Sequence, residues 1–215
     1  MRTIMVMNAK GGCGKSTLAT SIAAYFANNW EGVVALADYD PQTSSLDWLA
    51  KRPAERDPIL GVDAAKDGLK HLPRNTDYLI IDPPARAHGA ELTQLVRHAE
   101  TIVVPVLPSP IDIGAAAKFV QELLEVGKVE RREVKLAVVA NRVRENLLVF
   151  GELEQFLEGL KIPFIAKFRD AQNYIRAYSR GLGVHELPPY LAEEDWKQWK
   201  PLTDWLESRR SLPSR

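Results

Sequence analysis

Short apolar runs recur along the chain, and each is followed by a longer stretch in which apolar residues are spaced as on one face of a helix. The runs carry Val, Ile and Leu at consecutive positions, which is typical of parallel strands buried on both faces. The pattern predicts strands over residues 3–8, 33–39, 78–82, 101–106, 134–140 and 163–166.

Helix-like segments separate these runs, which predicts an α/β fold with a mostly parallel central sheet flanked by helices in three layers. Residues 51–67 are rich in proline and charge, carry the weakest pattern and are expected to form a surface excursion. The last helix is expected to kink at Pro201. The predicted helices cover residues 15–28, 43–51, 90–98, 113–126, 148–160, 171–180 and 192–208.

The length and composition favour a single α/β domain. The 215 residues can enclose one sizeable core and contain no long linker, so one domain over residues 1–215 is expected, with residues 191–215 packed on it as a C-terminal helix. Lys and Arg number 28 and Asp and Glu number 28, which argues against coating nucleic acid by bulk charge but leaves a local basic patch open. One cysteine excludes a disulfide framework. No signal-like or membrane-spanning stretch is seen, so a cytoplasmic location is expected.

A glycine-rich loop lies between the first predicted strand and the first predicted helix. A helix start offers free N–H groups and the positive end of the helix dipole, and glycines let the backbone curl around phosphate oxygens. In this loop Lys15 is expected to reach the β- and γ-phosphates and Ser16 to bind Mg²⁺. The alternative is a glycine turn that only starts a helix. The predicted nucleotide-binding residues of the loop are Lys10, Gly11, Gly12, Cys13, Gly14, Lys15, Ser16 and Thr17.

Acidic residues follow two of the predicted strands. Asp38 and Asp40 end the second run, and Asp82 ends the third. Ligands of α/β sheets sit at the carboxyl ends of the strands, so these side chains are expected to gather beside the phosphate loop. Asp82, at the end of an apolar strand, fits the acid that holds Mg²⁺ in P-loop proteins. The alternative for each acid alone is a cap at the end of a strand.

A further lysine near the front of the loop makes the motif more specific, and Ala9 stands where the standard motif has glycine. The loop resembles the deviant Walker A motif of the ParA/MinD family of ATPases, and in particular the short ParA type without an N-terminal DNA-reading domain. The resemblance extends from Lys10 to about Gly183. It implies a P-loop NTPase fold, ATP and Mg²⁺ as cofactors, and a homodimer in which Lys10 reaches the nucleotide of the partner chain.

The same resemblance assigns roles to other residues. The stretch around Asp40-Pro41-Gln42 resembles an acidic motif in which Asp40 orients the attacking water and Asp38 supports the magnesium shell. The implied catalytic residues are Lys10, Lys15 and Asp40, and the implied metal residues are Ser16, Asp38 and Asp82.

Asn141 stands where the family contacts adenine, and a proline-rich stretch places Pro108 and Pro110 near the dimer interface; this stretch could also be a simple strand exit. GTP-specific relatives would show Lys-x-Asp after the strand that ends at Ala140, and no Asp stands at that offset. Iron–sulfur relatives need cysteines that this chain lacks.

The segment 169–180 carries a basic stripe. At about 100° per residue, Arg169, Arg176 and Arg180 fall on one helical line. A solvated face is the ordinary interpretation of such a stripe. The resemblance adds a second one, in which Arg169, Arg176, Arg180 and Lys167 contact DNA phosphates without sequence preference.

Near the end of the chain lies an apolar stripe of Trp196, Trp199, Leu202 and Leu206. MinD-type relatives end in an amphipathic helix that binds the membrane, so a membrane anchor is one interpretation of this stripe. Pro201 interrupts this stripe and acidic residues dilute its positive charge, so packing on the domain is favoured over membrane binding.

The expected function is a ParA-like ATPase that positions or partitions a cargo. ATP would close a dimer, and this dimer would bind DNA non-specifically and so associate with the nucleoid. A partner protein would stimulate slow ATP hydrolysis. The cargo could be a plasmid, a chromosome or a protein-bounded compartment. The alternatives are a MinD-like membrane-cycling ATPase that regulates the division site, and a metabolic P-loop phosphotransferase.

Overall fold

The computed structural model describes residues 1–130, 133–144, 151–159 and 161–213. The chain divides into two compact units. The first unit consists of Met1–Val6, Lys15–Pro84 and Ala171–Trp196, and the second of Met7–Gly14, Ala85–Asp170 and Lys197–Arg215. The expectation of a single domain stays a prediction.

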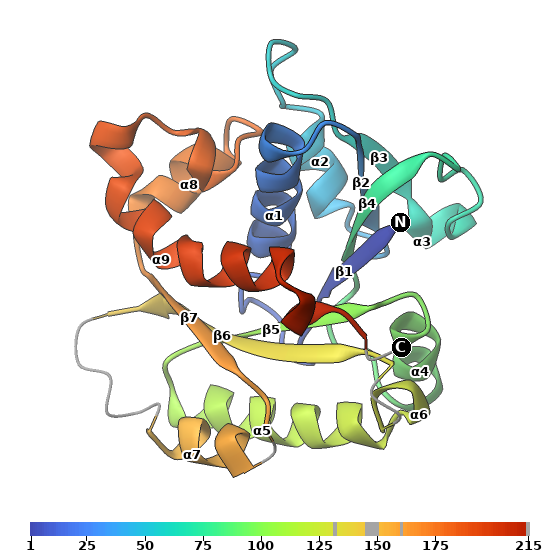
Figure 1. Cartoon of the computed structure of the whole chain (residues 1–215), viewed down its shortest axis with the longest axis vertical. Coiled ribbons are helices and arrows are strands. Elements are labelled where there is room, and N and C mark those ends of the chain that lie inside the picture. The colour runs from blue at the N-terminus through green and yellow to red at the C-terminus, as the bar shows by residue number, and fades with distance from the viewer. Residues whose placement is uncertain (131–132, 145–150, 160, 214–215) are drawn as a thin grey trace. The chain divides into compact units, whose positions relative to one another are not determined.

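The strands form a parallel sheet with flanking helices, as predicted (Figure 1). Their order is β3-β2-β4-β1-β5-β6-β7. The pairs β1–β4, β2–β3, β2–β4, β5–β6 and β6–β7 are all parallel. The strands are β1 (Arg2–Val6), β2 (Val33–Asp38), β3 (Leu60–Asp63), β4 (Thr76–Asp82), β5 (Thr101–Val106), β6 (Lys135–Val143) and β7 (Phe164–Arg169).

The first unit is built around helix α1 (Lys15–Asn29), which packs against β1, β2 and β4. Three aromatic side chains pack together in this unit. Phe26 stacks on Tyr78 with ring centroids 4.1 Å apart, and Trp30 contacts the same tyrosine edge-on. Helices α2 (Ser44–Leu49), α3 (Ala64–Asp67) and α8 (Gln172–Tyr178) and the short 3₁₀ helix η2 (Val184–Glu186) also belong to this unit.

Strand β3 corrects the expectation for residues 51–67. Instead of a surface excursion throughout, this stretch contains an edge strand that pairs with β2 from Ala35 to Asp38. The strand is only 4 residues long, its first two residues are exposed and only Val62 is buried, so it lacks the continuous apolar run of the other strands. Gly61 fits because a Cβ there would lie 2.9 Å from a methyl carbon of Leu49.

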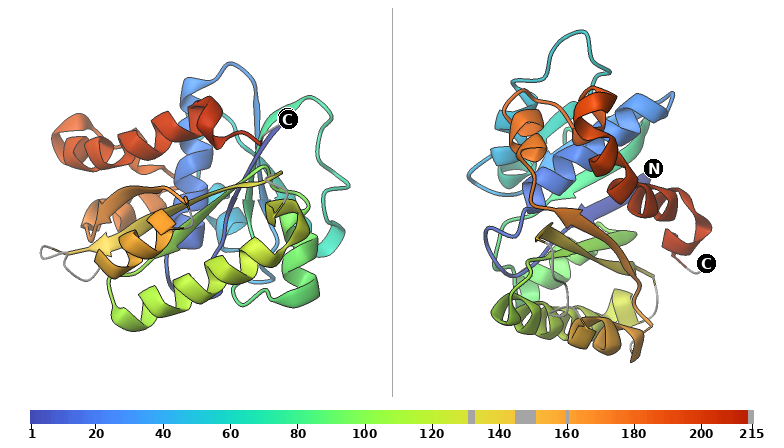
Figure 2. Two further views of the ribbon diagram at one scale, coloured as in Figure 1. Left: turned by 60° about the horizontal axis from the view of Figure 1, so that its bottom comes forward. Right: turned by 90° about the vertical axis from the view of Figure 1, so that its left-hand side faces the viewer.

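The second unit contains the remaining three strands. Helices α5 (Pro110–Glu125) and α7 (Gly151–Gly159) lie side by side on one face of β5–β7, as Figures 1 and 2 show. Trp199 of helix α9 (Pro189–Glu207) stacks on Phe168 of β7, with ring centroids 4.6 Å apart. Helices α4 (Gly89–Val96) and α6 (Gly127–Glu130) and the 3₁₀ helix η3 (Arg209–Ser211) complete the unit.

Each predicted helix has a counterpart, with shifted ends. Residues 148–150 and 160 of the predicted helix 148–160 lie outside the described residues. Helix α9 continues through Pro201. Within its apolar stripe Trp199, Leu202 and Leu206 are at most 2% exposed, and the indole of Trp196 donates to the carbonyl oxygen of Val184. Among the described helices, none is both long and apolar enough to cross a membrane.

Candidate functional site

The glycine-rich loop is held at its front by Asn8. The side-chain amide of Asn8 donates to the carbonyl oxygen of Pro105 at 2.7 Å, and its Oδ1 accepts from the backbone N–H of Lys10 at 3.2 Å. The strand predicted over residues 3–8 therefore ends two residues early, because Asn8 turns from the sheet ladder to hold the loop. Gly12 and Gly14 have φ of 76° and 93°, a region that glycine enters at little cost.

Asn141 holds the back of the same loop. Its Nδ2 donates to the carbonyl oxygen of Cys13 at 2.9 Å, and its Oδ1 accepts from the backbone N–H of Arg142. Asn141 is buried, and the left-handed φ of 53° at Arg142 marks an irregularity at the end of β6. Cys13 is itself buried. The structure thus assigns the amide of Asn141 to the loop backbone, and the predicted contact with adenine stays a prediction.

Lys10 forms an ion pair within its own chain. Its Nζ lies 2.5 Å from Oδ1 of Asp112, in the first turn of α5. Although burial acts in the opposite direction, the hydrogen bonds from Lys10 and Ser109 lower the pKa of Asp112. Pro110 is the first residue of this helix and Ser109 is its N-cap, so the proline-rich stretch ends as a preorganised helix start. Pro108 is half-buried, whereas Pro110 is exposed and Ile111 is 78% exposed.

Helix α1 begins directly after the loop, at Lys15. Lys15 is only 8% exposed, and Ser16 and Thr17 are half-buried. The first turn itself contains no acidic residue, so its own side chains leave the positive end of the helix dipole available to an anion. This helix start has the charge and the free N–H groups that a phosphate requires.

Asp38 is a structural anchor at the end of β2. Its Oδ1 accepts from the N–H of Asp40, and its Oδ2 accepts from the N–H groups of Ser45 and Leu46. Burial raises the pKa of this carboxyl; the three backbone hydrogen bonds lower it, and the charge of Asp40 adds to the rise. Asp38 thus fixes the first turn of α2. Asp40 is half-buried, and its Oδ1 accepts from the N–H of Gln42.

Asp82 has one bonded and one open oxygen. Its Oδ2 accepts from the hydroxyl of Ser45 at 2.5 Å, whereas its Oδ1 is buried without a hydrogen-bond partner. Burial raises the pKa of Asp82 to about 6, and the charge of Asp38 adds to the rise. The hydroxyls of Ser45 and Ser16 and the ammonium group of Lys15 act in the opposite direction. The pKa of Asp82 is thus set by Lys15 and Ser16 as well as by its own burial.

These oxygens fit a magnesium ion. Mg²⁺ prefers oxygen donors and in P-loop sites takes one or two carboxylates together with substrate phosphates. The described residues contain no group of three or more His, Cys, Asp or Glu side chains that could hold a metal without such a substrate. An open buried carboxylate oxygen beside a serine hydroxyl is therefore suited to a metal that arrives with a nucleotide.

The predicted basic stripe is wrong as a helical feature. Strand β7 continues to Arg169, and α8 begins only at Gln172. Arg169 belongs to the second unit and Arg176 to the first, so the two do not share a helix face. The strand prediction stopped at residue 166, because Lys167 and Arg169 break the apolar run although Phe168 between them is fully buried.

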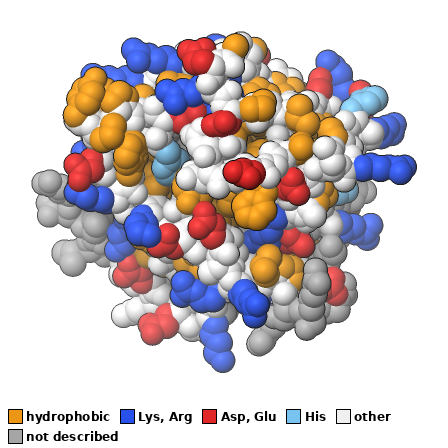
Figure 3. Space-filling view, turned by 45° about the horizontal axis from the view of Figure 1, so that its top comes forward, with side chains coloured by type: hydrophobic (Ala, Val, Ile, Leu, Met, Phe, Trp, Pro, Cys, Tyr) orange, Lys and Arg blue, Asp and Glu red, His pale blue; other side chains and the backbone are white. Residues whose placement is uncertain are grey.

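The other members of the stripe are differently placed. Arg176 and Arg180 are exposed, and Lys167 forms an ion pair with Glu154 at 2.7 Å. Acidic and basic side chains are interspersed on the face drawn in Figure 3.

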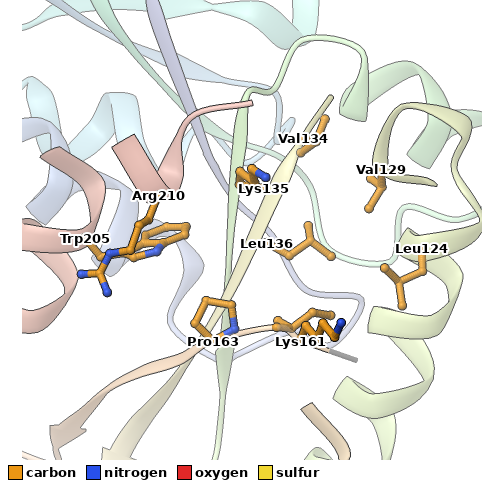
Figure 4. A pocket seen from close by; sticks show the side chains of 10 residues that line it. Leu124, Val129, Val134, Lys135, Leu136, Lys161, Pro163, Trp205 and Arg210 are labelled. Atoms are coloured by element: carbon orange, nitrogen blue, oxygen red, sulfur yellow. The ribbon is translucent and has the colours of Figure 1, made fainter. Parts of the chain in front are cut away.

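A cavity of about 510 Å³ lies in the second unit. Leu136 and Trp205 form part of its apolar wall, and Lys135, Lys161 and Arg210 bring positive charge to it (Figure 4). None of the predicted loop or acidic residues lines it.

Comparison with known proteins identifies the family. Residues 4–184 match the family of the CobQ/CobB/MinD/ParA nucleotide binding domain. The chain belongs to this family. Maintenance of carboxysome distribution protein A of Halothiobacillus neapolitanus is 31% identical over 191 residues, which cover 86% of this chain and 87% of that protein. The protein of the same name in Gloeobacter kilaueensis is 29% identical, over 96% of this chain and 94% of that protein.

Solved structures confirm the predicted P-loop fold. The MinD cell division protein of Aquifex aeolicus superposes with a TM-score of 0.70 at 20% identity, over the full length of both chains. MinD of Pyrococcus horikoshii complexed with Mg-ADP gives 0.71 at 15% identity, over 96% of each chain. An ATP complex of a Cyanothece McdA variant gives 0.70 at 17% identity, over 94% of this chain and 96% of that one.

Sequence reasoning missed four residues that shape the site. Asn8 and Asp112 hold the loop and its front lysine, and Ser45 and Tyr178 lie close to the acids. Asp112 lies at the end of the proline-rich stretch that contains Pro108 and Pro110, and Asn8 is the last residue of the first predicted strand. Ser45 gave no signal, since a serine in the first turn of a helix is ordinary.

Proposed function

We propose that this protein is an ATPase that switches between a monomer and an ATP-bound dimer to position a cargo. The observation that carries the proposal is Asp82, whose open oxygen is buried and whose pKa is affected by both Lys15 and Ser16. These residues are the phosphate lysine, the metal serine and the metal acid of the predicted P-loop. Membership of the family supports nucleotide binding by this chain, and the proposal adds that the bound ATP is hydrolysed.

Each residue has a distinct role in this proposal. The loop residues from Lys10 to Thr17 bind the phosphates, with Lys15 on the β- and γ-phosphates. Ser16 and Asp82 would hold Mg²⁺, which neutralises charge on the phosphate oxygens. Asp38 acts behind them, since backbone N–H groups already occupy both of its oxygens. Asp40, half-buried and close in sequence to Asp38, orients the attacking water.

The proposed dimer uses the front of the loop. Lys10 retains 40% side-chain exposure in its pair with Asp112, so it can exchange that partner for a phosphate. Exposed Pro110 and Ile111 and half-buried Pro108 lie close to Asp112 in the chain and supply contact surface around the proposed two-fold axis. Asn141 is proposed to support the loop and to contact adenine.

The cargo is proposed from the relatives. Two carboxysome distribution proteins match most of this chain, which favours a protein-bounded compartment over a plasmid or a chromosome. We propose that the ATP-bound dimer holds nucleoid DNA in the cytoplasm and that a partner protein carried by the cargo stimulates hydrolysis. Exposed Arg176 and Arg180 are the strongest candidates for DNA contacts, with Lys167 and Arg169 as further candidates.

Sedimentation separates this function from the membrane alternative. The protein is incubated with Mg²⁺ and ATP or ADP, together with plasmid DNA or with anionic liposomes. The proposal expects the wild-type protein to sediment with DNA in ATP but not in ADP. The double variant Arg176→Glu/Arg180→Glu should not sediment with DNA, because it loses contacts to phosphates. Each lost contact should also lower the salt dependence of binding. ATP-dependent sedimentation with liposomes alone would instead favour a membrane-cycling ATPase. Rapid turnover of an added metabolite would favour a phosphotransferase.

A further inference from the structure

Tyr178, at the end of α8, lies against the start of α2. Its hydroxyl donates to the carbonyl oxygen of Ser44 at 2.8 Å. Burial raises the pKa of Tyr178 to about 12, and the charges of Asp82, Asp38 and Asp47 add to the rise. The phenol therefore keeps its proton and remains a hydrogen-bond donor, although carboxylates lie near it. Both helices belong to the first unit.

The start of α2 is hydrogen-bonded to both buried acids, Asp82 and Asp38. The hydroxyl of Ser45 donates to Asp82, and the N–H of Ser45 donates to Asp38. Thr43, just before the helix, has a left-handed φ of 52°, a conformation that is strained for a residue with a Cβ. The surrounding hydrogen bonds therefore have to hold this turn in place.

The rest of α2 and the turn that follows it are also bound to the segment after α8. The indole of Trp48 donates to the carbonyl oxygen of Leu182, and Arg52 donates to both carboxylate oxygens of Glu186 at 2.9 and 2.8 Å. The Arg52 and Glu186 side chains are at most 5% exposed. At Gly181 a Cβ would lie 2.3 Å from the backbone nitrogen of Arg52, so the two segments pack in close contact.

We propose that Tyr178 is a positioning residue for the magnesium site, which acts through Ser44 and Ser45 on Asp82 and Asp38. The proposal rests on the proposed function, since it takes Asp82 as the acid that binds Mg²⁺ with ATP and Asp38 as the acid that supports it from behind. Tyr178 fixes the turn that orients the acids, and the acids in turn fix the end of α8. The same short segment carries exposed Arg176 and Arg180, so occupancy of the metal site is coupled to the surface proposed for DNA.

Coupling of this kind is reciprocal, because each ligand must favour the arrangement that the other favours. A ligand that immobilises α8 raises the affinity for Mg²⁺-ATP by the factor by which Mg²⁺-ATP raises the affinity for that ligand. Removing the hydroxyl of Tyr178 weakens both effects by the same factor and leaves the ring in place.

The test measures ATP affinity at a series of Mg²⁺ concentrations for wild type, Tyr178→Phe and the control Tyr190→Phe, whose tyrosine is 84% exposed. In Tyr178→Phe the Mg²⁺ concentration for half-maximal affinity should rise roughly three- to tenfold, the effect of one hydrogen bond. ATP affinity in EDTA should equal that of wild type. Tyr190→Phe should match wild type throughout.

Two outcomes would overturn the proposal and can be told apart. A Tyr178→Phe protein that melts at a lower temperature but keeps the wild-type Mg²⁺ dependence would make Tyr178 a purely structural residue. In that case the proposed function stands. A wild-type protein whose ATP affinity is independent of Mg²⁺ would contradict the proposed function, and this inference with it.

Hydrogen exchange supplies a second readout of the coupling. Mg²⁺-ATP should slow amide exchange in residues 172–180 of wild type, since ordering the acids closes the local opening of α8. In Tyr178→Phe this protection should be reduced, while protection of the glycine-rich loop persists. Equal protection of residues 172–180 in both proteins would contradict the coupling.

Discussion

At the scale of single residues, the buried acid Asp82 links the proposed metal site to the stability of the protein. A carboxyl whose pKa rises on folding makes the folded state bind more protons, so its contribution lowers stability as pH rises from the unfolded to the folded pKa. For Asp82 that window runs from 3.8 to about 6. The rise is equivalent to about 3 kcal/mol at neutral pH. The site therefore keeps a destabilising charge where the proposed function needs one.

Asp82→Asn should thus stabilise the metal-free protein. We expect a gain of about 2–3 kcal/mol at pH 7 and little change near pH 4, because the wild-type carboxyl is neutral there. Urea unfolding of both proteins at pH 7 and at pH 4, without nucleotide, measures this difference in stability. Mg²⁺-ATP should then stabilise wild type far more than Asp82→Asn. A variant less stable than wild type at pH 7 would show that the ionised carboxyl contributes net stability.

Lys15 gives a second prediction at this scale. Lys15→Ala should weaken ATP binding by about 10- to 100-fold or more, since a charge-assisted hydrogen bond to phosphate is lost. Titration calorimetry with Mg²⁺-ATP measures the affinity. Lys118→Ala, which removes an exposed lysine from α5, is the matched control and should bind as wild type does. Unchanged affinity in Lys15→Ala would remove the loop from the nucleotide site.

At the scale of elements, hydrophobic patterning predicted the buried strands and the longer helices, because long apolar runs determine burial on both faces. It missed β3, whose four residues include a glycine and take their place from β2 and α2 instead. It also carried Arg169 into a helix, although the buried Phe168 keeps that segment in the sheet. The loop and the acids could be predicted from motifs. Ser45 and Tyr178 could not, because Ser45 meets Asp82 from 37 residues away and Tyr178 meets Ser44 from 134 residues away.

Gly61 tests the packing of this edge. Gly61→Ala should destabilise the protein by about 1–3 kcal/mol, since the new methyl group meets Leu49 and Leu46 at 2.9 and 3.0 Å. Gly114→Ala is the control, because it lies within α5 and its Cβ would meet nothing within 4 Å. That change should stabilise by about 0.5–1 kcal/mol through helix propensity. The midpoints of urea unfolding measure the stability of both variants. If Gly61→Ala were as stable as Gly114→Ala, the side chains of Leu49 and Leu46 would have to move aside at no cost.

At the scale of the whole molecule, the proposed function is that of a nucleotide-driven switch. The family, the loop and the acids support nucleotide binding, and the intrachain pair of Lys10 with Asp112 is the state from which Lys10 would move to a partner's phosphate. The proposal assigns binding, dimerisation and hydrolysis to different residues. In it Lys10 would serve dimerisation, Lys15 would serve binding and Asp40 would serve hydrolysis.

Molar mass from light scattering, in Mg²⁺-ATP and in Mg²⁺-ADP, tests this division most directly. Wild type should have the mass of two chains in ATP and of one chain in ADP. Asp40→Ala should remain a dimer in ATP, because it keeps the phosphate contacts and loses only the group that orients water. Lys10→Ala should bind ATP and remain a monomer. A dimeric Lys10→Ala protein, a monomeric Asp40→Ala protein, or a wild type whose mass ignores the nucleotide would contradict the account.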